Sequence, residues 1–226
     1  MLSFNMGDKI FTSPESIGDL KSIWLDYPII NFDDFQNKIK LIVDIGSNVG
    51  TTCAHFKVNY PNSRVVGFEP NLVCHEWLNK NALIFDYDWF PYAISDYEGV
   101  SDLYFGKLGN CSNSLISSLR TTGGKVSVEV RLLESVVALK DIDVLKVDTE
   151  GSELAIIKYL LPKATPKLLY IEYHSEADRI WLTTEMQKDY ILVSAYVLQP
   201  FVGTLTYIRK DVLKTFSKLD NYKDCF

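Results

Sequence analysis

The end of the chain limits the fold more than any other feature of the sequence. Two strand-like segments, 190–198 and 203–208, are separated by only a short turn. Such a turn permits an antiparallel hairpin and is too short for the helical crossover that joins two parallel strands. The segments upstream alternate between strand-like and helix-like patterns, which is typical of a parallel sheet. The sequence therefore predicts a mostly parallel α/β sheet that ends in an antiparallel pair.

The strands that precede this hairpin are predicted from short apolar or alternating runs. They are expected at 41–46, 64–70, 89–94, 125–133, 143–148 and 167–174, with a further antiparallel piece at 99–105. Helices are expected between them at 51–60, 71–83 and 151–161. A parallel sheet with such a terminal hairpin is the Rossmann-like methyltransferase architecture rather than a plain dinucleotide-binding fold.

Residues 1–40 are predicted to form a helical cap on the domain formed by residues 41–226. Ser13 is a suitable N-cap, and Pro14 would occupy the first helical position. Three apolar residues then share one helical face: Ile17, Leu20 and Trp24. We expect this face to pack on the main domain.

Composition narrows the classes of partner. The chain has 226 residues, of which 47% are hydrophobic and 23% charged, as in a globular domain that needs no disulfide or metal staple. The formal net charge is −6 and no basic run is present, so nucleic acid is not an expected partner. The four cysteines lie far apart without a C-x-x-C pair, which predicts reduced thiols rather than a zinc cluster.

No targeting or membrane segment is recognised in the sequence. The N-terminal residues lack a basic region followed by an apolar stretch, so no signal peptide is expected. The longest apolar-rich stretch, 190–202, is interrupted by Ser194, Gln199 and Pro200 and is too short to span a bilayer. The sequence therefore predicts a soluble, cytoplasmic protein without a membrane partner.

The loop after the first predicted strand suits a cofactor. Asp44 lies at the end of the strand, and Gly46, Ser47, Asn48 and Gly50 follow it and open a helix. Glycines let backbone N–H groups approach a ligand closely, and a helix N-terminus favours an anionic group. S-adenosylmethionine (SAM) offers its methionine carboxylate there, and Asp44 can accept hydrogen bonds from its amino group. The G-x-x-x-G spacing fits a dinucleotide pyrophosphate poorly, because the G-x-G-x-x-G pattern is missing.

The ends of the next two strands complete this predicted cofactor site. Glu69 ends the second strand, where an acidic side chain can bond both ribose hydroxyls of a nucleoside. Ala93 and Ile94 end the third strand and would border the adenine ring.

Further polar residues mark the ends of two later strands. Asp148 lies where the strand at 143–148 runs out, on the usual ligand side of an open α/β sheet. Lys146 shares its face of that strand, so the two side chains are able to pair. Glu150 projects near the start of the next helix. His174 ends the following strand at the same edge, where an imidazole can accept a proton near neutral pH.

Six segments occur together in an order that resembles a known family. They are VDIGSNVGTT (43–52), VVGFEPN (65–71), YAISDYEGVSDLYF (92–105), SNSL (112–115), LKVDTEGSE (145–153) and YIEYH (170–174). Over about residues 41–175 the chain is similar to the FkbM-type SAM-dependent methyltransferases. The resemblance implies a Rossmann-like class I fold: a seven-stranded sheet, helices on both faces, and a last pair that is antiparallel. It also implies SAM as the methyl donor and usually a hydroxyl acceptor.

Acceptor recognition is less well marked in the sequence. The family often has an Asn shortly before the Ala of the third strand, whereas Pro91 and Tyr92 precede Ala93 here, so the adenine edge is expected to be bound differently. Acceptor choice is expected to come from the cap and from the loop at 106–124. The residues expected to line the acceptor pocket are Tyr92, Tyr104, Ser112, Asn113 and Ser114.

Three functions remain open at this point. The first is an O-methyltransferase acting on a small-molecule or glycan acceptor, with one of Asp148, Glu150 and His174 as the base. The second is the same transfer assisted by Mg²⁺; its ligands would be Asp148, Glu150, Glu172 and His174. The third is a SAM-binding protein without catalysis.

Overall fold

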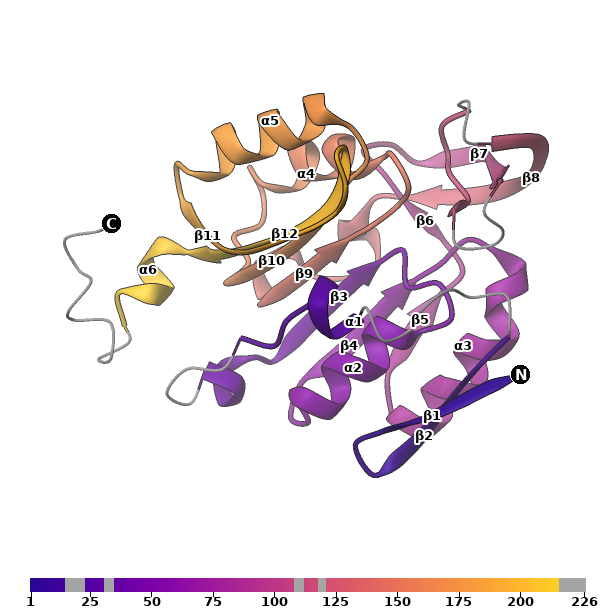
Figure 1. Ribbon diagram of the computed structural model, residues 1–226, viewed down its shortest axis with the longest axis horizontal. Coiled ribbons are helices and arrows are strands. Elements are labelled where there is room, and N and C mark those ends of the chain that lie inside the picture. Colours follow the sequence, from indigo (N-terminus) through magenta and orange to yellow (C-terminus); the bar gives the residue numbers. More distant parts are fainter. Residues whose placement is uncertain (15–22, 31–34, 108–111, 118–120, 216–226) are drawn as a thin grey trace.

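The computed structural model describes residues 1–14, 23–30, 35–107, 112–117 and 121–215. Its main sheet has seven strands (Figure 1). In spatial order they are β11 (Tyr190–Gln199), β12 (Val202–Arg209), β10 (Leu168–Tyr173), β9 (Val144–Val147), β3 (Leu41–Ile45), β4 (Arg64–Phe68) and β5 (Asp88–Phe90). β12 runs antiparallel to both of its neighbours, and the other adjacent pairs are parallel. The predicted class I methyltransferase fold is therefore confirmed.

Alternate residues of the central strands are buried on opposite faces of this sheet. Ile42 and Val144 belong to one hydrophobic cluster, and their chain neighbours Val43 and Leu145 belong to the other. A strand buried on both faces explains why these segments read as continuous apolar runs in the sequence.

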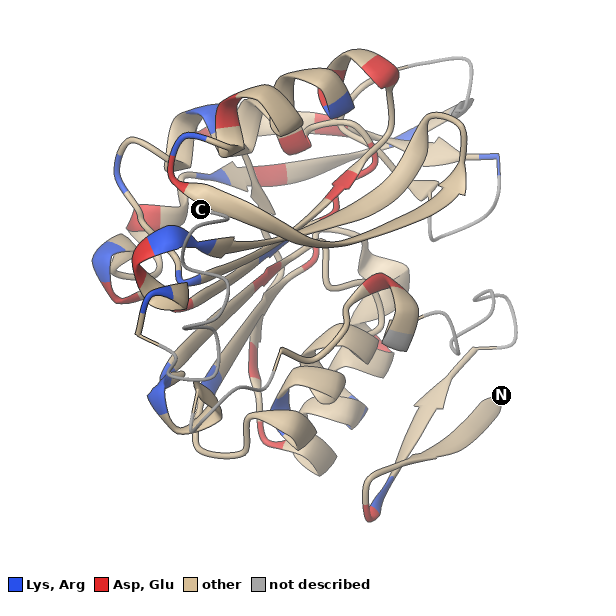
Figure 2. Cartoon of the chain, turned by 60° about the vertical axis from the view of Figure 1, so that its left-hand side comes forward, with Lys and Arg blue, Asp and Glu red and all other residues tan. Residues whose placement is uncertain are grey.

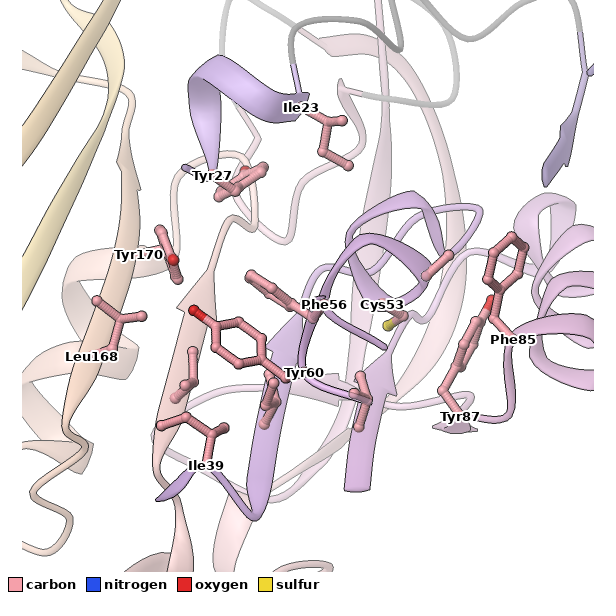
Figure 3. Close-up of a cluster of buried hydrophobic side chains, with 14 of the residues drawn as sticks. Ile23, Tyr27, Ile39, Cys53, Phe56, Tyr60, Phe85, Tyr87, Leu168 and Tyr170 are labelled. Atoms are coloured by element: carbon pink, nitrogen blue, oxygen red, sulfur yellow. The ribbon is translucent and has the colours of Figure 1, made fainter. Parts of the chain in front are cut away.

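Helices cover both faces (Figure 1). On one face, α2 (Thr51–Asn59) and α3 (Leu72–Phe85) contribute to the first cluster, which Figure 3 shows in close-up. On the other face, α4 (Glu153–Leu160) and α5 (Glu176–Met186) contribute to the second cluster. Helix α5 was not predicted; the Ser175 hydroxyl caps it by accepting from the Asp178 N–H at 3.1 Å.

The C-terminal hairpin is formed by β11 and β12, as predicted, with β11 at one edge of the sheet. Figure 2 shows the hairpin almost free of charge, because β11 has no charged residue and β12 ends in its only one, Arg209. A four-residue helix, α6 (Lys210–Leu213), follows it.

A second sheet differs from the sequence-based expectation. It has the order β6-β8-β7, formed by β6 (Ala93–Ile94), β7 (Gly99–Gly106) and β8 (Thr121–Arg131). The strand predicted at 89–94 is split, since β5 pairs with β4 and β6 pairs with β8. Pro91 lies at the break and has no N–H to continue a ladder. The strand predicted at 125–133 also belongs to this sheet rather than to the main one.

The chain begins with a hairpin that the sequence did not predict. Strands β1 (Leu2–Met6) and β2 (Lys9–Ser13) pair around Gly7, whose φ is 65°. Phe11 is buried, and Asn81 of α3 donates from Nδ2 to the Thr12 carbonyl at 2.9 Å. Alternate side chains of β2 are buried, so one face of the hairpin packs on α3, and the helix predicted after Ser13 lies largely outside the described residues.

The other features expected of the cap lie largely outside the described residues. Ile17 and Leu20 lie outside them, as does the side chain of Trp24, and the described helix there is only α1 (Ile23–Asp26). The division into a cap at 1–40 and a domain at 41–226 stays a prediction. Within the described ranges, none of the helices is long and apolar enough to cross a membrane.

Candidate active site

The loop between β3 and α2 adopts a conformation that requires glycine. Gly46 has a φ of 84°, and a Cβ on it would lie 1.7 Å from the Asp148 carbonyl oxygen. Gly50 has a φ of 85°, and a Cβ there would lie 1.9 Å from the Tyr87 hydroxyl. Asn48 between them is also left-handed, with a φ of 50°. The loop is therefore held tightly against the end of β9.

Glu69 connects this loop to the end of β4. Its Oε2 accepts from the Asn48 N–H at 2.8 Å, and its Oε1 accepts from the Asn71 N–H at 2.9 Å. The residue is 9% exposed, and burial raises the pKa of its carboxyl to about 7 despite these two hydrogen bonds. Each oxygen retains a lone pair for a further donor.

A cleft lies along the carboxyl ends of these strands. It holds about 610 Å³ of space, part of which is open solvent. The predicted cofactor and catalytic residues that line it are Gly46, Asn48, Glu69, Ala93, Ile94, Asp148 and Glu150. Leu103, Asn113 and Leu115 line it from the β7 region. One cleft thus brings together seven of the eleven predicted site residues.

The other four predicted site residues are not part of the cleft lining among the described residues; they are Asp44, Ser47, Gly50 and His174. Asp44 is fully buried; its Oδ1 lies 3.0 Å from the Lys146 Nζ, and its Oδ2 accepts from the Cys53 thiol at 3.2 Å. Asp44 therefore stabilises the loop from within the protein interior. This buried position does not fit the predicted contact between Asp44 and the amino group of SAM. Ser47 is 2% exposed.

Lys146 ties three parts of the site together. Its Nζ donates to the Gly46 carbonyl at 2.6 Å and lies 3.0 Å from Asp44 Oδ1 and 3.4 Å from Asp148 Oδ2. Burial opposes the charge of this lysine, but the carboxylates of Asp44 and Asp148 outweigh it and raise the pKa of Lys146. The pairing with Asp148 expected from the sequence is confirmed.

Asp148 and Glu172 titrate in opposite directions. Burial acts against the charge of Asp148, yet Lys146 holds the pKa of its carboxyl well below the usual range. Burial and the charge of Asp148 raise the pKa of Glu172 well above its ordinary value. Of the two carboxyls, Asp148 therefore carries the charge more readily, and Glu172 holds its proton more tightly than an ordinary glutamate.

His174 bridges two carboxylates at the end of β10. Its Nε2 lies 3.0 Å from Glu150 Oε2, and its Nδ1 lies 3.2 Å from Glu153 Oε1. Burial disfavours the imidazolium, but the hydrogen bonds to Glu150 and Glu153 raise the pKa of His174 to about 12. This shift argues against His174 as a base at neutral pH, because an imidazolium cannot accept a proton.

Glu150 and Glu153 have different environments in this network. Glu153 accepts from the Thr149 N–H at 2.7 Å and from the Gly151 N–H at 2.9 and 3.0 Å, which fixes the loop before α4. Glu150 lines the cleft, has a left-handed φ of 58°, and burial raises the pKa of its carboxyl. Strained backbone of this kind is concentrated at functional sites.

A metal-ligating group is also present. One ligand atom each from Asp148, Glu153 and His174 lie within 4.8 Å of one another. Glu153 and His174 already contact the loop and each other, so binding Mg²⁺ would require these contacts to be exchanged. The arrangement in this structure is that of an ion-pair network.

The predicted acceptor residues divide into two sets. Tyr92 and Asn113 line the cleft. Tyr104 and Ser114 pair through their backbones at 2.8 and 3.0 Å, and like Ser112 they are outside the cleft lining among the described residues. Sequence reasoning missed Tyr27, whose hydroxyl donates to Asp148 Oδ2 at 2.9 Å. It lies in the N-terminal segment, where no motif marks it.

Comparisons with known proteins agree with this architecture. Residues 44–210 match a family model described as "Methyltransferase FkbM domain". "Methyltransferase sdnD" of Sordaria araneosa is 30% identical over 152 residues, which cover 52% of this chain and 59% of that protein. "Methyltransferase 1" of Beauveria bassiana (strain ARSEF 2860) is 26% identical over 166 residues, which cover 62% and 65%. The chain therefore spans less than two thirds of the length of these two relatives.

A solved structure shows the same fold at low sequence identity. A chain of the crystal structure of the fibrillarin/Nop5p complex superimposes with a TM-score of 0.51 and is 12% identical. The match covers 92% of this chain and 97% of that one. At this identity the likeness establishes the fold alone.

Proposed function

The chain belongs to the FkbM family of SAM-dependent methyltransferases, and from this we propose that it transfers the SAM methyl group to a hydroxyl of a sugar or natural-product acceptor. The observation that supports this most is the position of Glu150. Glu150 lines the cleft that holds the predicted cofactor residues, and burial raises the pKa of its carboxyl. A raised pKa makes a carboxylate a better proton acceptor near neutral pH.

The order of strands supports an orientation for SAM. Ala93 and Ile94 would contact the adenine, and Glu69 at the end of β4 would accept from the ribose hydroxyls. Gly46 and Asn48, after β3, would then contact the methionine end. β9 is the next strand, so Asp148 lies on the side of the sulfonium, away from the adenine.

In the proposed reaction the acceptor hydroxyl oxygen attacks the methyl carbon in line with the carbon–sulfur bond. A carbon–oxygen bond forms, the carbon–sulfur bond breaks with its electrons staying on sulfur, and S-adenosylhomocysteine (SAH) is released. Glu150 takes the hydroxyl proton. His174, as an imidazolium, holds the Glu150 carboxylate through its Nε2 at 3.0 Å.

The partners proposed for the protein follow its charge. The net charge of −6 supports a neutral small molecule or glycan as the acceptor, without nucleic acid. We also propose a cytoplasmic location without a membrane partner, because the four cysteines lie far apart and are expected to be reduced.

A radiolabel assay tests the proposed function. It measures transfer from methyl-³H-labelled SAM to a panel of monosaccharides, glycosides and polyols, with amines as a parallel panel. Label in an ether product supports it, and label only in amine products contradicts the hydroxyl acceptor. SAM binding without transfer to any member of either panel would favour a non-catalytic role. In the same assay, loss of transfer after chelation and recovery with Mg²⁺ would favour metal assistance; we expect transfer to be insensitive to the chelator.

Replacing Glu69 by alanine is expected to weaken SAM binding. We expect micromolar binding by the wild type, about 8 kcal/mol. Loss of the charged acceptor for the ribose hydroxyls should reduce it by about 1–3 kcal/mol. Calorimetry measures the change, and Glu76→Ala on the exposed face of α3 is the matched control. Equal affinities for Glu69→Ala and Glu76→Ala would remove Glu69 from the cofactor site.

The pH dependence of SAM binding gives a second readout of the same carboxyl. Its pKa in the free protein is raised to about 7, so Glu69 is largely protonated below this pH and ionised above it. Because the ribose hydroxyls donate to the ionised form, affinity should rise as the pH increases through about 7. Glu69→Gln should remove this rise.

A further inference from the structure

Tyr27 joins the N-terminal segment to the candidate active site. Its hydroxyl donates to Asp148 Oδ2 at 2.9 Å, and the residue is buried. It lies before the part of the chain that matches the family model, residues 44–210. The contact therefore joins a residue outside the matched range to one inside it.

The backbone around Tyr27 is fixed by three hydrogen bonds from the main domain. We call residues 27–30 the strap. His55 donates from Nε2 to the Tyr27 carbonyl at 3.0 Å, Tyr170 donates to the Pro28 carbonyl at 2.6 Å, and Tyr60 donates to the Ile30 carbonyl at 3.1 Å. Tyr27 and Tyr170 also pack edge to face, with ring centroids 5.9 Å apart (Figure 3). The strap is thus held in one position on α2 and β10.

The contact from Tyr27 competes with a contact from Lys146. Both donors approach the same oxygen of Asp148, Oδ2. Lys146 lies 3.4 Å from this oxygen but only 3.0 Å from Asp44 Oδ1. Burial and the charge of Asp148 raise the pKa of Tyr27, so its phenol keeps the proton that it donates. Without this donor the Asp148 carboxylate is free to move closer to Lys146, which would neutralise more of its charge.

We propose that Tyr27 is a positioning residue that holds the Asp148 carboxylate toward the sulfonium end of bound SAM. This inference rests on the orientation of SAM described under the proposed function. The sulfonium of SAM is positively charged, whereas the thioether of SAH is neutral. A carboxylate held near the sulfur therefore favours SAM over SAH, and the ratio of the two affinities reports the position of Asp148 without any acceptor.

Calorimetric titration of SAM and of SAH into Tyr27→Phe tests the proposal. The phenylalanine keeps the ring that packs on Tyr170 and removes only the hydroxyl. We expect the preference for SAM over SAH to fall about 3- to 10-fold, the equivalent of part of a charge-assisted hydrogen bond. Tyr60→Phe is the matched control, because it also removes one buried hydroxyl bound to the strap, one that donates to the Ile30 carbonyl rather than to Asp148.

Two further measurements separate positioning from a general loss of structure. A purely structural role would lower the unfolding temperature and weaken SAM and SAH equally, as we expect for Tyr60→Phe. Asp148→Asn should itself reduce the preference for SAM, and adding Tyr27→Phe to it should change the ratio no further, because Tyr27 acts through Asp148.

Several outcomes would overturn the inference. An unchanged ratio in Tyr27→Phe contradicts positioning, and a higher ratio would mean that the hydroxyl only weakens the charge of Asp148. A ratio unaffected by Asp148→Asn would show that Asp148 is distant from the sulfur, whatever the behaviour of Tyr27→Phe. These results leave the proposed function intact, whereas failure of the wild type to bind either SAM or SAH would overturn both.

Discussion

Lys146→Met is expected to lower the free energy of unfolding by about 3–5 kcal/mol, the usual cost of removing one partner from a buried ion pair. The methionine fills a similar volume, so the loss is mainly electrostatic. Asp44 is fully buried and would lose its only cationic neighbour among the described contacts, and the Gly46 carbonyl would lose its donor. Urea unfolding followed by circular dichroism measures the change.

The control for this variant is an exposed lysine. Lys80 lies 2.6 Å from Glu76 on the surface of α3, with 48% of its side chain exposed. Exposed pairs contribute about 0–1 kcal/mol, so Lys80→Met should have little effect. The double variant Lys146→Met with Asp44→Asn should recover part of the loss, because it removes the unpaired charge. Equal destabilisation by Lys146→Met and Lys80→Met would contradict the network described for the site.

The main sheet was predictable because its strands are buried on both faces. Runs such as 41–46 and 143–148 are mainly apolar, and each strand ends at glycine or polar residues at its carboxyl end. The order of parallel strands then placed Glu69, Asp148 and His174 at one edge without knowledge of any side-chain contact. The cleft follows from that order.

The environment of each polar group was not predictable from the sequence. His174 was considered as a base because an isolated imidazole titrates near neutral pH, but its two neighbouring glutamates raise its pKa to about 12. Asp44 was considered as a group that binds the cofactor, but its carboxylate forms an ion pair with Lys146 of a neighbouring strand, 3.0 Å away. Both outcomes depend on contacts between residues far apart in the chain.

The N-terminal segment shows a further limit of sequence reasoning. No strand was predicted before Ser13, yet alternating side chains at 2–13 form a hairpin that packs on α3. Tyr27 has no neighbouring motif, and its role depends on a hydrogen bond to a residue 121 positions later. Local propensity carries no information about such a contact.

Glu150→Gln is expected to lower kcat by about 10²–10⁴-fold, the typical contribution of a general base. Glutamine preserves the shape of the side chain and its contact with His174 but cannot take a proton. Glu150 does not belong to the predicted cofactor set, so SAM affinity should change little. The acceptor identified in the radiolabel assay serves for kinetics, and Glu129→Gln in β8, an exposed surface position, is the control.

The pH profile identifies which carboxylate acts. The base must be ionised, and burial raises the pKa of Glu150 above the ordinary 4.5, so wild-type kcat should fall as the pH decreases through this raised value. No inflection from His174 is expected near 6.5, since it stays protonated up to about pH 12. If Asp148 were the base, its lowered pKa would move the fall in kcat to much more acidic pH.

Near-wild-type kcat in Glu150→Gln, together with a large loss in Asp148→Asn, would therefore transfer the role of base to Asp148. Retention of activity by both variants would leave positioning of donor and acceptor as the source of catalysis.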